Sequence, residues 1–295
     1  MDPAIIADYM CEVGEGPLWH PVDKRLYWAD IPAGRLFQHD PATGGHHVFY
    51  DGDVVGGFTF QADGSLLLFM ARGRVAVLRD GVLTNIIDEL PGEEELRFND
   101  VVADVEGRVF CGTIPSDDAL EGDLLGRLYR LDTDGCITKV LDDVAISNGM
   151  GFSPDRKRMY FTDSLKGIDV FDYDQATGEI TNRTPLVGLP EDGSGPDGLA
   201  VDAEGNLWSA RWGASGVFGH HPDGKQFRKV AFPTEAVSSV TFGGEDYTDM
   251  YVTTAGGHDK AKGGPHAGAL FKVDIGVKGL PEFLSRIGLP VANAR

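Results

Sequence analysis

The sequence is short of basic residues and of long hydrophobic runs, and each shortage excludes a class of protein. Lys and Arg together number 26 against 46 Asp and Glu, which gives a net charge of −20. Nucleic acids and anionic membrane surfaces are both bound through Lys and Arg, so neither is an expected partner. No apolar run approaches the ~18 residues of a membrane-spanning helix. Residues 1–10 also lack the basic segment and the long apolar stretch of a signal peptide.

Cysteine is equally scarce, and stretches with helical periodicity are missing. The three cysteines, Cys11, Cys111 and Cys136, show no paired spacing, so they are interpreted as reduced thiols of a cytoplasmic protein. Glycine, by contrast, is abundant, with 40 residues. Asp-Gly pairs recur at positions 51–52, 63–64, 80–81, 134–135, 192–193, 197–198 and 223–224. Short runs typical of β-strands lie between these turns, which indicates an all-β protein.

The strand-like runs repeat along the chain. Six β-rich phrases each follow a turn, and their first residues lie 40, 43, 50, 48 and 43 positions apart. They are Leu26-Tyr27-Trp28, Leu66-Leu67-Leu68, Val109-Phe110-Cys111, Met159-Tyr160-Phe161, Leu207-Trp208-Ser209 and Met250-Tyr251-Val252. A period of ~40–50 residues that contains several short strands is that of a propeller blade. We therefore predict an all-β fold, a six-bladed β-propeller, with residues 1–295 in a single domain. Two β-sandwiches would not explain the even spacing.

A propeller must close its ring or leave the edge of its last blade exposed. The last strand-like segment covers residues 268–273, and a spare segment, residues 5–10, precedes the first repeat. We expect this N-terminal segment to pair with the last blade as a strand and so to close the ring.

One position, 10 or 11 residues before each β-rich phrase, is polar in most of the repeats. The six residues at this position are Glu15, Gly56, Asn99, Asn148, Asp197 and Ser239. Equivalent positions around a ring converge on its axis, so two carboxylates and two amide oxygens should meet there. These are the ligands of hard cations, calcium above all, and the lack of Cys and His disfavours a dedicated zinc site. A single Asn-Gly or Asp-Gly pair often marks only a turn, but the matched positions favour a site.

Several phrases resemble those of the SMP-30/gluconolactonase family, also called regucalcin-like, and they span almost the whole chain. They are Gly14-Glu15-Gly16-Pro17, Arg97-Phe98-Asn99-Asp100, Ser147-Asn148-Gly149, Pro196-Asp197-Gly198 and Phe242-Gly243-Gly244-Glu245-Asp246-Tyr247. The resemblance implies a metal-dependent hydrolase that opens a sugar lactone to the aldonic acid. It also implies one divalent metal ion, with Ca²⁺ as the first choice and Zn²⁺, Mg²⁺, Mn²⁺ or Fe²⁺ as alternatives.

The resemblance further implies a role for each site residue. Glu15, Asn148 and Asp197 would hold the metal ion. Arg97 and Asn99 would touch the substrate, with Asn99 near the metal or on it through substrate or water. Asp197 is also the candidate catalytic base, and direct attack by its carboxylate is the alternative.

Two departures from the family pattern leave the sugar and the lactone ring size open. Val101 follows the Asn-Asp pair where many members have Gly, and the Gly-Thr phrase at 112–113 is followed by no Glu before Glu121. An organophosphate-hydrolysing propeller and a non-catalytic calcium-binding propeller are the alternative functions. The oligomeric state and the role of the Gly-rich stretch 255–268 also stay open.

Other polar and aromatic residues carry weaker expectations. Arg97 has an alternative role in a salt bridge with one of the glutamates at 93–95. The paired histidines at 46–47 and 220–221 lie beside turn residues, so we expect them to be exposed in loops. The tryptophans should pack between the blades, and Trp212 is the exception best suited to face a sugar.

Overall fold

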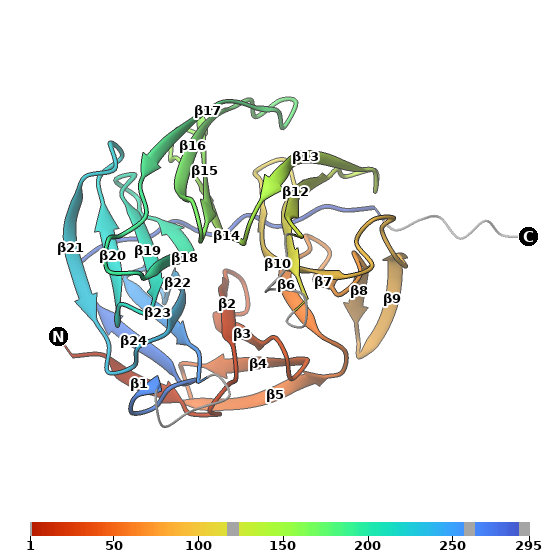
Figure 1. Cartoon of the computed structure of the whole chain (residues 1–295). Coiled ribbons are helices and arrows are strands. Elements are labelled where there is room, and N and C mark those ends of the chain that lie inside the picture. Colours follow the sequence, from red (N-terminus) through yellow and green to blue (C-terminus); the bar gives the residue numbers. More distant parts are fainter. Residues whose placement is uncertain (1, 117–123, 257–262, 289–295) are drawn as a thin grey trace, which may run out of the picture.

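The computed structural model describes residues 2–116, 124–256 and 263–288, and the regular structure of these residues consists of 24 β-strands. The strands form six sheets of four strands each, arranged as blades around a central axis (Figure 1). The predicted six-bladed β-propeller is thereby confirmed. Within the described ranges no helix is long and apolar enough to cross a membrane.

Each of the first five blades is one continuous stretch of chain. Blade 1 contains β2 (Gly14–His20), β3 (Arg25–Asp30), β4 (Arg35–Asp40) and β5 (Gly45–Asp51). Blade 2 contains β6 (Val55–Phe60), β7 (Leu66–Met70), β8 (Val75–Arg79) and β9 (Val82–Ile87). Blade 3 contains β10 (Leu96–Ala103), β11 (Val109–Pro115), β12 (Gly126–Leu131) and β13 (Ile137–Val144). Blade 4 contains β14 (Ser147–Phe152), β15 (Arg158–Asp163), β16 (Gly167–Tyr173) and β17 (Ile180–Val187). Blade 5 contains β18 (Gly195–Val201), β19 (Leu207–Trp212), β20 (Gly216–His220) and β21 (Gln226–Ala231).

Blade 6 joins the two ends of the chain. It contains β22 (Val237–Gly243), β23 (Asp249–Thr254), β24 (Leu270–Asp274) and β1 (Ala4–Ala7). Strand β1 pairs antiparallel with β24, so the predicted closure by an N-terminal strand is confirmed. The strand ends earlier than predicted, because the chain turns at Met10, where φ is +50°. Cys11 then donates its N–H to the carbonyl of Gly268 at 3.0 Å.

The turns between strands account for part of the acidic excess. Between β10 and β11, Oδ1 of Asp104 accepts the N–H groups two and four residues further on, at 2.9 and 3.0 Å. Asp202 makes the same two bonds between β18 and β19, at 2.9 and 2.8 Å. A carboxylate that accepts a nearby backbone N–H stabilises a turn of this kind. Many of the acidic residues therefore have a structural role rather than a role in binding.

The hydrophobic core lies between neighbouring blades and includes side chains of the innermost strands. One cluster contains Trp208 of blade 5 and Phe271 of blade 6, and another joins Trp28 of blade 1 to Tyr251 of blade 6. The innermost strands β2, β6, β10, β14, β18 and β22 contact one another around the axis. Because the core holds the blades together, side chains that point along the axis are available for other roles.

The residues after β24 cross the end of the channel where the innermost strands finish. The N–H groups of Gly279, Ser285 and Arg286 donate to carbonyls of blades 6, 2 and 3, each at 2.8 Å. We call residues 277–288 the C-terminal strap. It passes behind the ring in Figure 1, at the end of the channel opposite the beginnings of the innermost strands.

Candidate metal centre and active site

A β-bulge marks the recurring position in each innermost strand. The pairing of β2 with β3 shifts between Glu15 and Leu18, and that of β18 with β19 shifts between Pro196 and Leu199. The other four innermost strands shift at the matching place. A bulge re-aims a side chain and is common beside functional sites. The repeat thus directs one residue of each blade toward the start of the channel.

Glycines next to these positions let the innermost strands approach closely. Gly16 has a φ of +54°, which a residue with a side chain rarely adopts. A Cβ atom at Gly198 would lie 2.0 Å from Oγ of Ser239, and one at Gly149 would lie 2.2 Å from the backbone nitrogen of Leu199. Both contacts are too short for any side chain, so glycine at these places sets how tightly the site can close.

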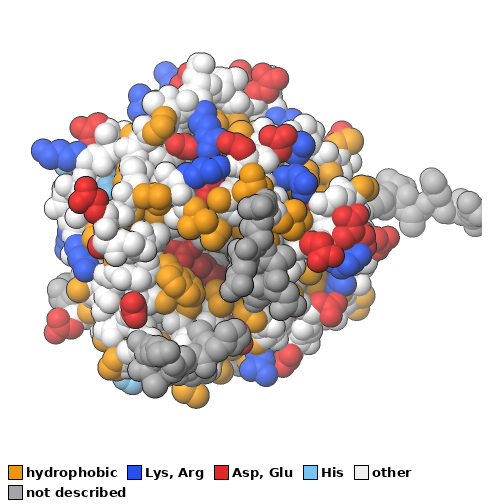
Figure 2. Space-filling view, in the orientation of Figure 1, with side chains coloured by type: hydrophobic (Ala, Val, Ile, Leu, Met, Phe, Trp, Pro, Cys, Tyr) orange, Lys and Arg blue, Asp and Glu red, His pale blue; other side chains and the backbone are white. Residues whose placement is uncertain are grey.

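The site residues predicted from the sequence lie together in one pocket. Four of them lie in the first half of an innermost strand, and each is at most 5% exposed: Glu15 in β2, Asn99 in β10, Asn148 in β14 and Asp197 in β18. Together with Arg97 they line a pocket of about 670 Å³. Figure 2 shows a hollow in this face of the molecule, with acidic side chains inside it and hydrophobic side chains around it.

Two buried oxygen atoms of the pocket, Oδ1 of Asn148 and Oδ1 of Asp197, have no hydrogen-bond partner among the described residues. The amide of Asn148 is oriented by its Nδ2, which donates to Oγ of Ser164 at 3.1 Å. A buried oxygen without a donor costs about 1–3 kcal/mol, and a cation would remove this cost. These two oxygens and the carboxylate of Glu15 are the donor set of a hard divalent cation.

A cation in this pocket would need the amide oxygen of Asn148 as a ligand in addition to the carboxylates of Glu15 and Asp197. In the part of the chain that the structure describes, no three Asp, Glu, His or Cys side chains form a metal site by themselves. Asn99 differs from Asn148, because its Oδ1 accepts from Nη1 of Arg97 at 2.7 Å and its Nδ2 donates to the carbonyl of Ser147 at 2.8 Å. Both ends of the Asn99 amide are therefore engaged within the protein. Of the glutamates considered as alternative partners of Arg97, Glu93 pairs with Arg127 at 2.5 Å.

The carboxyl groups of the site oppose one another's ionisation. Burial, and after it the charges of Asp197 and Asp100, raises the pKa of Glu15 well above its usual range. The N–H of Gly16 and the charge of Arg97 lower this pKa, but by less. Burial and the charge of Asp100 raise the pKa of Asp197 in the same way. Burial also raises the pKa of Asp100 to about 7, although Arg97 lowers it. A bound cation would favour the ionised forms of these groups.

Asp100, Ser164 and Trp212 are site residues to which the sequence analysis assigned no firm role. Asp100 lines a narrow void of about 50 Å³ that continues along the channel. Ser164 follows β15 directly and reaches the pocket beside Asn148. Trp212 is 43% exposed and lines the same pocket. It was the tryptophan that the sequence analysis considered best suited to face a sugar. Glu121 lies outside the described residues, as do residues 257–262 of the Gly-rich stretch.

Fold and site together define a six-bladed propeller with a cluster of oxygen donors at one end of its channel. The family described as SMP-30/Gluconolactonase/LRE-like region matches residues 13–256. The chain belongs to this family, as its motifs predicted.

Three similar proteins cover nearly the whole chain. The pentonolactonase XacC of Haloferax volcanii is 47% identical over 295 residues, with 96% of this chain and 98% of that protein covered. Regucalcin of Homo sapiens is 35% identical, with 92% and 94% covered. A solved structure of a calcium-binding protein, regucalcin, from Agrobacterium tumefaciens matches with a TM-score of 0.89 and 27% identity, over 97% of this chain and 98% of that one.

Proposed function

We propose that this protein is a divalent-metal-dependent hydrolase that opens the ring of a sugar lactone to the aldonic acid. The observation that carries the proposal is the pair of buried, unpartnered oxygens of Asn148 and Asp197 beside Glu15. The pocket above them, at about 670 Å³, is within the range of small-molecule sites. The name of the pentonolactonase that is 47% identical to this chain supports a lactone as the substrate, and a pentonolactone is the first one to test.

Glu15, Asn148 and Asp197 would hold the metal ion. Calcium is the first choice because all three donors are oxygens, and the regucalcin from Agrobacterium tumefaciens is named as a calcium-binding protein. Zn²⁺, Mg²⁺, Mn²⁺ and Fe²⁺ are the alternatives. When bound, a divalent ion supplies a Lewis acid that polarises the lactone carbonyl and stabilises the charge that develops on its oxygen.

Asp197 would be the base for the attacking water. Its carboxylate takes a proton from the water as the water oxygen bonds to the carbonyl carbon. The bond between that carbon and the ring oxygen then breaks, and the proton passes to the ring oxygen to give the hydroxyl of the open acid. A sugar lactone is already electrophilic, so a weak base suffices for this step.

Arg97 and Asn99 would orient the sugar. Their 2.7 Å hydrogen bond makes them one unit at the wall of the pocket, and the bond from Asn99 to the carbonyl of Ser147 ties this unit to blade 4. A rigid pair of polar groups can hold sugar hydroxyls in one orientation relative to Asp197. Such positioning lowers the entropic part of the barrier.

A lactone panel tests the proposal. Calcium-loaded protein should release acid from 1,4- or 1,5-lactones of pentoses or hexoses faster than spontaneous ring opening, and a chelator should abolish this activity. Asp197→Asn should remove it, whereas the matched control Asp51→Asn, on the exposed outer strand β5, should not. Hydrolysis of a phosphotriester in place of any lactone would favour the phosphotriesterase alternative, and neither activity would favour a calcium-binding propeller.

A single-turnover reaction in ¹⁸O-labelled water separates the two roles considered for Asp197. If Asp197 is a base, the label enters the acid product alone. If its carboxylate attacks the carbonyl carbon and displaces the ring oxygen, a mixed anhydride forms, and attack of water on the Asp197 carbon of that anhydride carries the label into the Asp197 carboxylate. Mass spectrometry of the peptide that contains Asp197 distinguishes these outcomes.

A further inference from the structure

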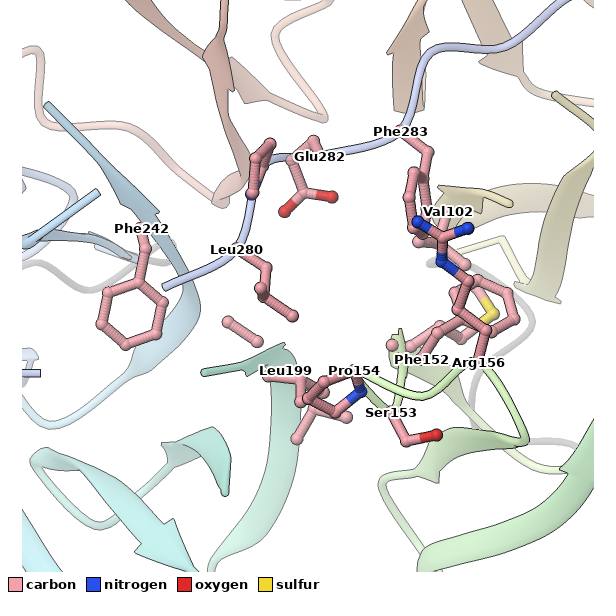
Figure 3. Close-up of a pocket in the computed structure, with 15 residues that line it drawn as sticks. Val102, Phe152, Ser153, Pro154, Arg156, Leu199, Phe242, Leu280, Glu282 and Phe283 are labelled. Carbon is pink, nitrogen blue, oxygen red and sulfur yellow. The ribbon is translucent and has the colours of Figure 1, made fainter. Parts of the chain in front are cut away.

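A second cavity, of about 230 Å³, lies at the far end of the channel. Its wall comes from the later parts of β14, β18 and β22, including Met150, Leu199 and Phe242. The innermost strands begin at the candidate metal centre, so this cavity is at the opposite end of the molecule. The C-terminal strap covers it with residues 280–283, between the backbone anchors at Gly279 and Ser285 (Figure 3).

Glu282 is the acidic group of this cavity. Figure 3 shows its carboxylate directed into the open space. The hydroxyl of Thr241, at 3.5 Å, is its hydrogen-bond donor, and no Lys, Arg or His of the described residues lies within ion-pair distance. A carboxylate that faces a mostly apolar cavity is destabilising unless a cation or several donors pair with it.

Three other titratable groups lie on the elements that face Glu282. Asp100 lines the narrow void that joins Glu282 to the upper channel. Burial, and after it the charge of Glu282, raises the pKa of Tyr247. Arg156 is at the edge of the cavity, with its guanidinium carbon 5.6 Å from the centre of the Phe283 ring. The Arg156 residue is exposed, so water screens its charge. The cavity therefore contains an acidic group that makes no ion pair among the described residues, and its basic residue, Arg156, lies at the solvent-exposed edge.

The size and the remaining walls of the cavity restrict what could pair with Glu282. Its other lining side chains are mostly apolar and include Phe152, Leu199, Val201, Phe242, Leu280 and Phe283. A water molecule occupies about 30 Å³ in the liquid, so the cavity holds roughly eight atoms or groups of that size. A hydrated metal ion would leave the apolar walls in contact with water, whereas an organic cation would cover them.

We propose that this cavity binds a small organic ammonium ion with an apolar body of about seven carbon atoms. The ammonium group would pair with Glu282, and the apolar body would lie against Leu199, Phe242 and Phe283. The site is separate from the candidate metal centre and does not depend on the proposed lactonase activity.

Benzylammonium and benzyl alcohol provide a matched pair of probes. They have the same ring and the same number of non-hydrogen atoms, and they differ in the group that would meet Glu282. Isothermal titration of the calcium-loaded, full-length protein at pH 8 should show that benzylammonium binds about tenfold to a hundredfold more tightly than benzyl alcohol, as expected for a charged hydrogen bond.

Three variants locate the binding. Glu282→Gln keeps the shape of the side chain and should abolish the preference for benzylammonium. Glu235→Gln removes one carboxylate from the opposite pocket and should leave the preference unchanged. Leu280→Trp keeps Glu282 but fills the cavity, so it should weaken the binding of both probes. The proposal is overturned if benzyl alcohol binds wild-type protein as tightly as benzylammonium, or if either Glu282→Gln or Leu280→Trp binds benzylammonium with unchanged affinity.

Discussion

Replacement of Asp197 by Asn should stabilise the metal-free protein and abolish its stabilisation by calcium. Asp197 is only 4% exposed, and burial and the charge of Asp100 raise its pKa, so its ionised form is costly without a cation. Asn has nearly the same shape and no charge. The substitution should raise the free energy of unfolding of the metal-free protein by about 1–2 kcal/mol, which is within the range of single stabilising substitutions.

Calcium should stabilise the wild-type protein. A ligand at about 100 times its dissociation constant stabilises the folded state by about 2.7 kcal/mol. For a chain of this size, about 1 kcal/mol shifts the melting temperature by roughly 2–4 °C, so calcium should raise it by about 5–10 °C. Asp197→Asn removes one of the two carboxylates of the site, and most of this gain should disappear.

Differential scanning calorimetry, first with chelator and then with increasing calcium, measures both effects. Glu15→Gln should behave like Asp197→Asn, and Asp51→Asn should behave like the wild type under both conditions. Equal calcium-dependent gains in the wild type and in both site variants would refute the assignment of the metal ligands. A large loss of stability in metal-free Asp197→Asn would show that the carboxylate has a structural role.

Three further predictions follow from the site, the ring closure and the strap. Asn99→Ala should leave the metal content unchanged but lower kcat/KM for a lactone by about tenfold to a hundredfold, because a substrate contact is lost; metal analysis and steady-state kinetics check this. Deletion of residues 1–10 should lower the melting temperature by more than about 5 °C, because it exposes the edge of β24, and an unchanged value would mean that the ring closes in another way. Burial raises the pKa of Glu282 from 4.5 to about 7 in the folded protein, so the folded state holds the proton and loses stability as the pH rises through this window. Urea unfolding should therefore show Glu282→Gln to be more stable than the wild type at pH 8, by at most about 3 kcal/mol, with little difference at pH 4.5.

The ring and its site could be predicted because a propeller repeats one pattern in every blade. Residues at a position that recurs before each β-rich phrase must meet at the axis of the ring. The sequence therefore places Glu15, Asn148 and Asp197 in one site, although the first and the last of them are 182 positions apart. The expected packing of Trp28 and Trp208 between blades is also confirmed, since each is at most 1% exposed. These are properties of the repeat, and the repeat is visible in the sequence.

The sequence could not predict contacts that lie outside the repeat. His220 was expected in an exposed loop, but it ends β20 and is 2% exposed. Its Nδ1 lies 3.2 Å from the carbonyl of Gly224, and it pairs with Leu207 of β19. His46 and His47 are exposed as expected, but they belong to strand β5 rather than to a loop. Burial of a polar residue at the end of a strand depends on the neighbouring blade, which no local pattern encodes.

The strap is the clearest example of this limit. Residues 277–288 show no strand pattern, and their backbone bonds reach blades 6, 2 and 3, which are far apart in sequence. Only this path brings Glu282 to the channel, so no pattern in the sequence separates it from the many solvent-exposed acidic residues. Carboxylates such as those of Asp104 and Asp202 make Glu282 harder to single out, because they are numerous and serve to accept backbone N–H groups in turns.

The channel is thus acidic at both ends, and the surroundings of each carboxylate determine which cation it suits. Near Asp197 the additional metal ligand would be the amide oxygen of Asn148, and unpartnered oxygens suit a compact divalent cation that prefers oxygen ligands. Near Glu282 the additional surface is apolar, and a compact ion would leave that surface wet. Neither arrangement benefits the empty protein, since a carboxylate that is shielded from water and has no cation beside it costs stability that an amide would not. The same measurement therefore applies to both ends: a neutral substitution should stabilise the empty protein and should remove the response to calcium at one end and to benzylammonium at the other.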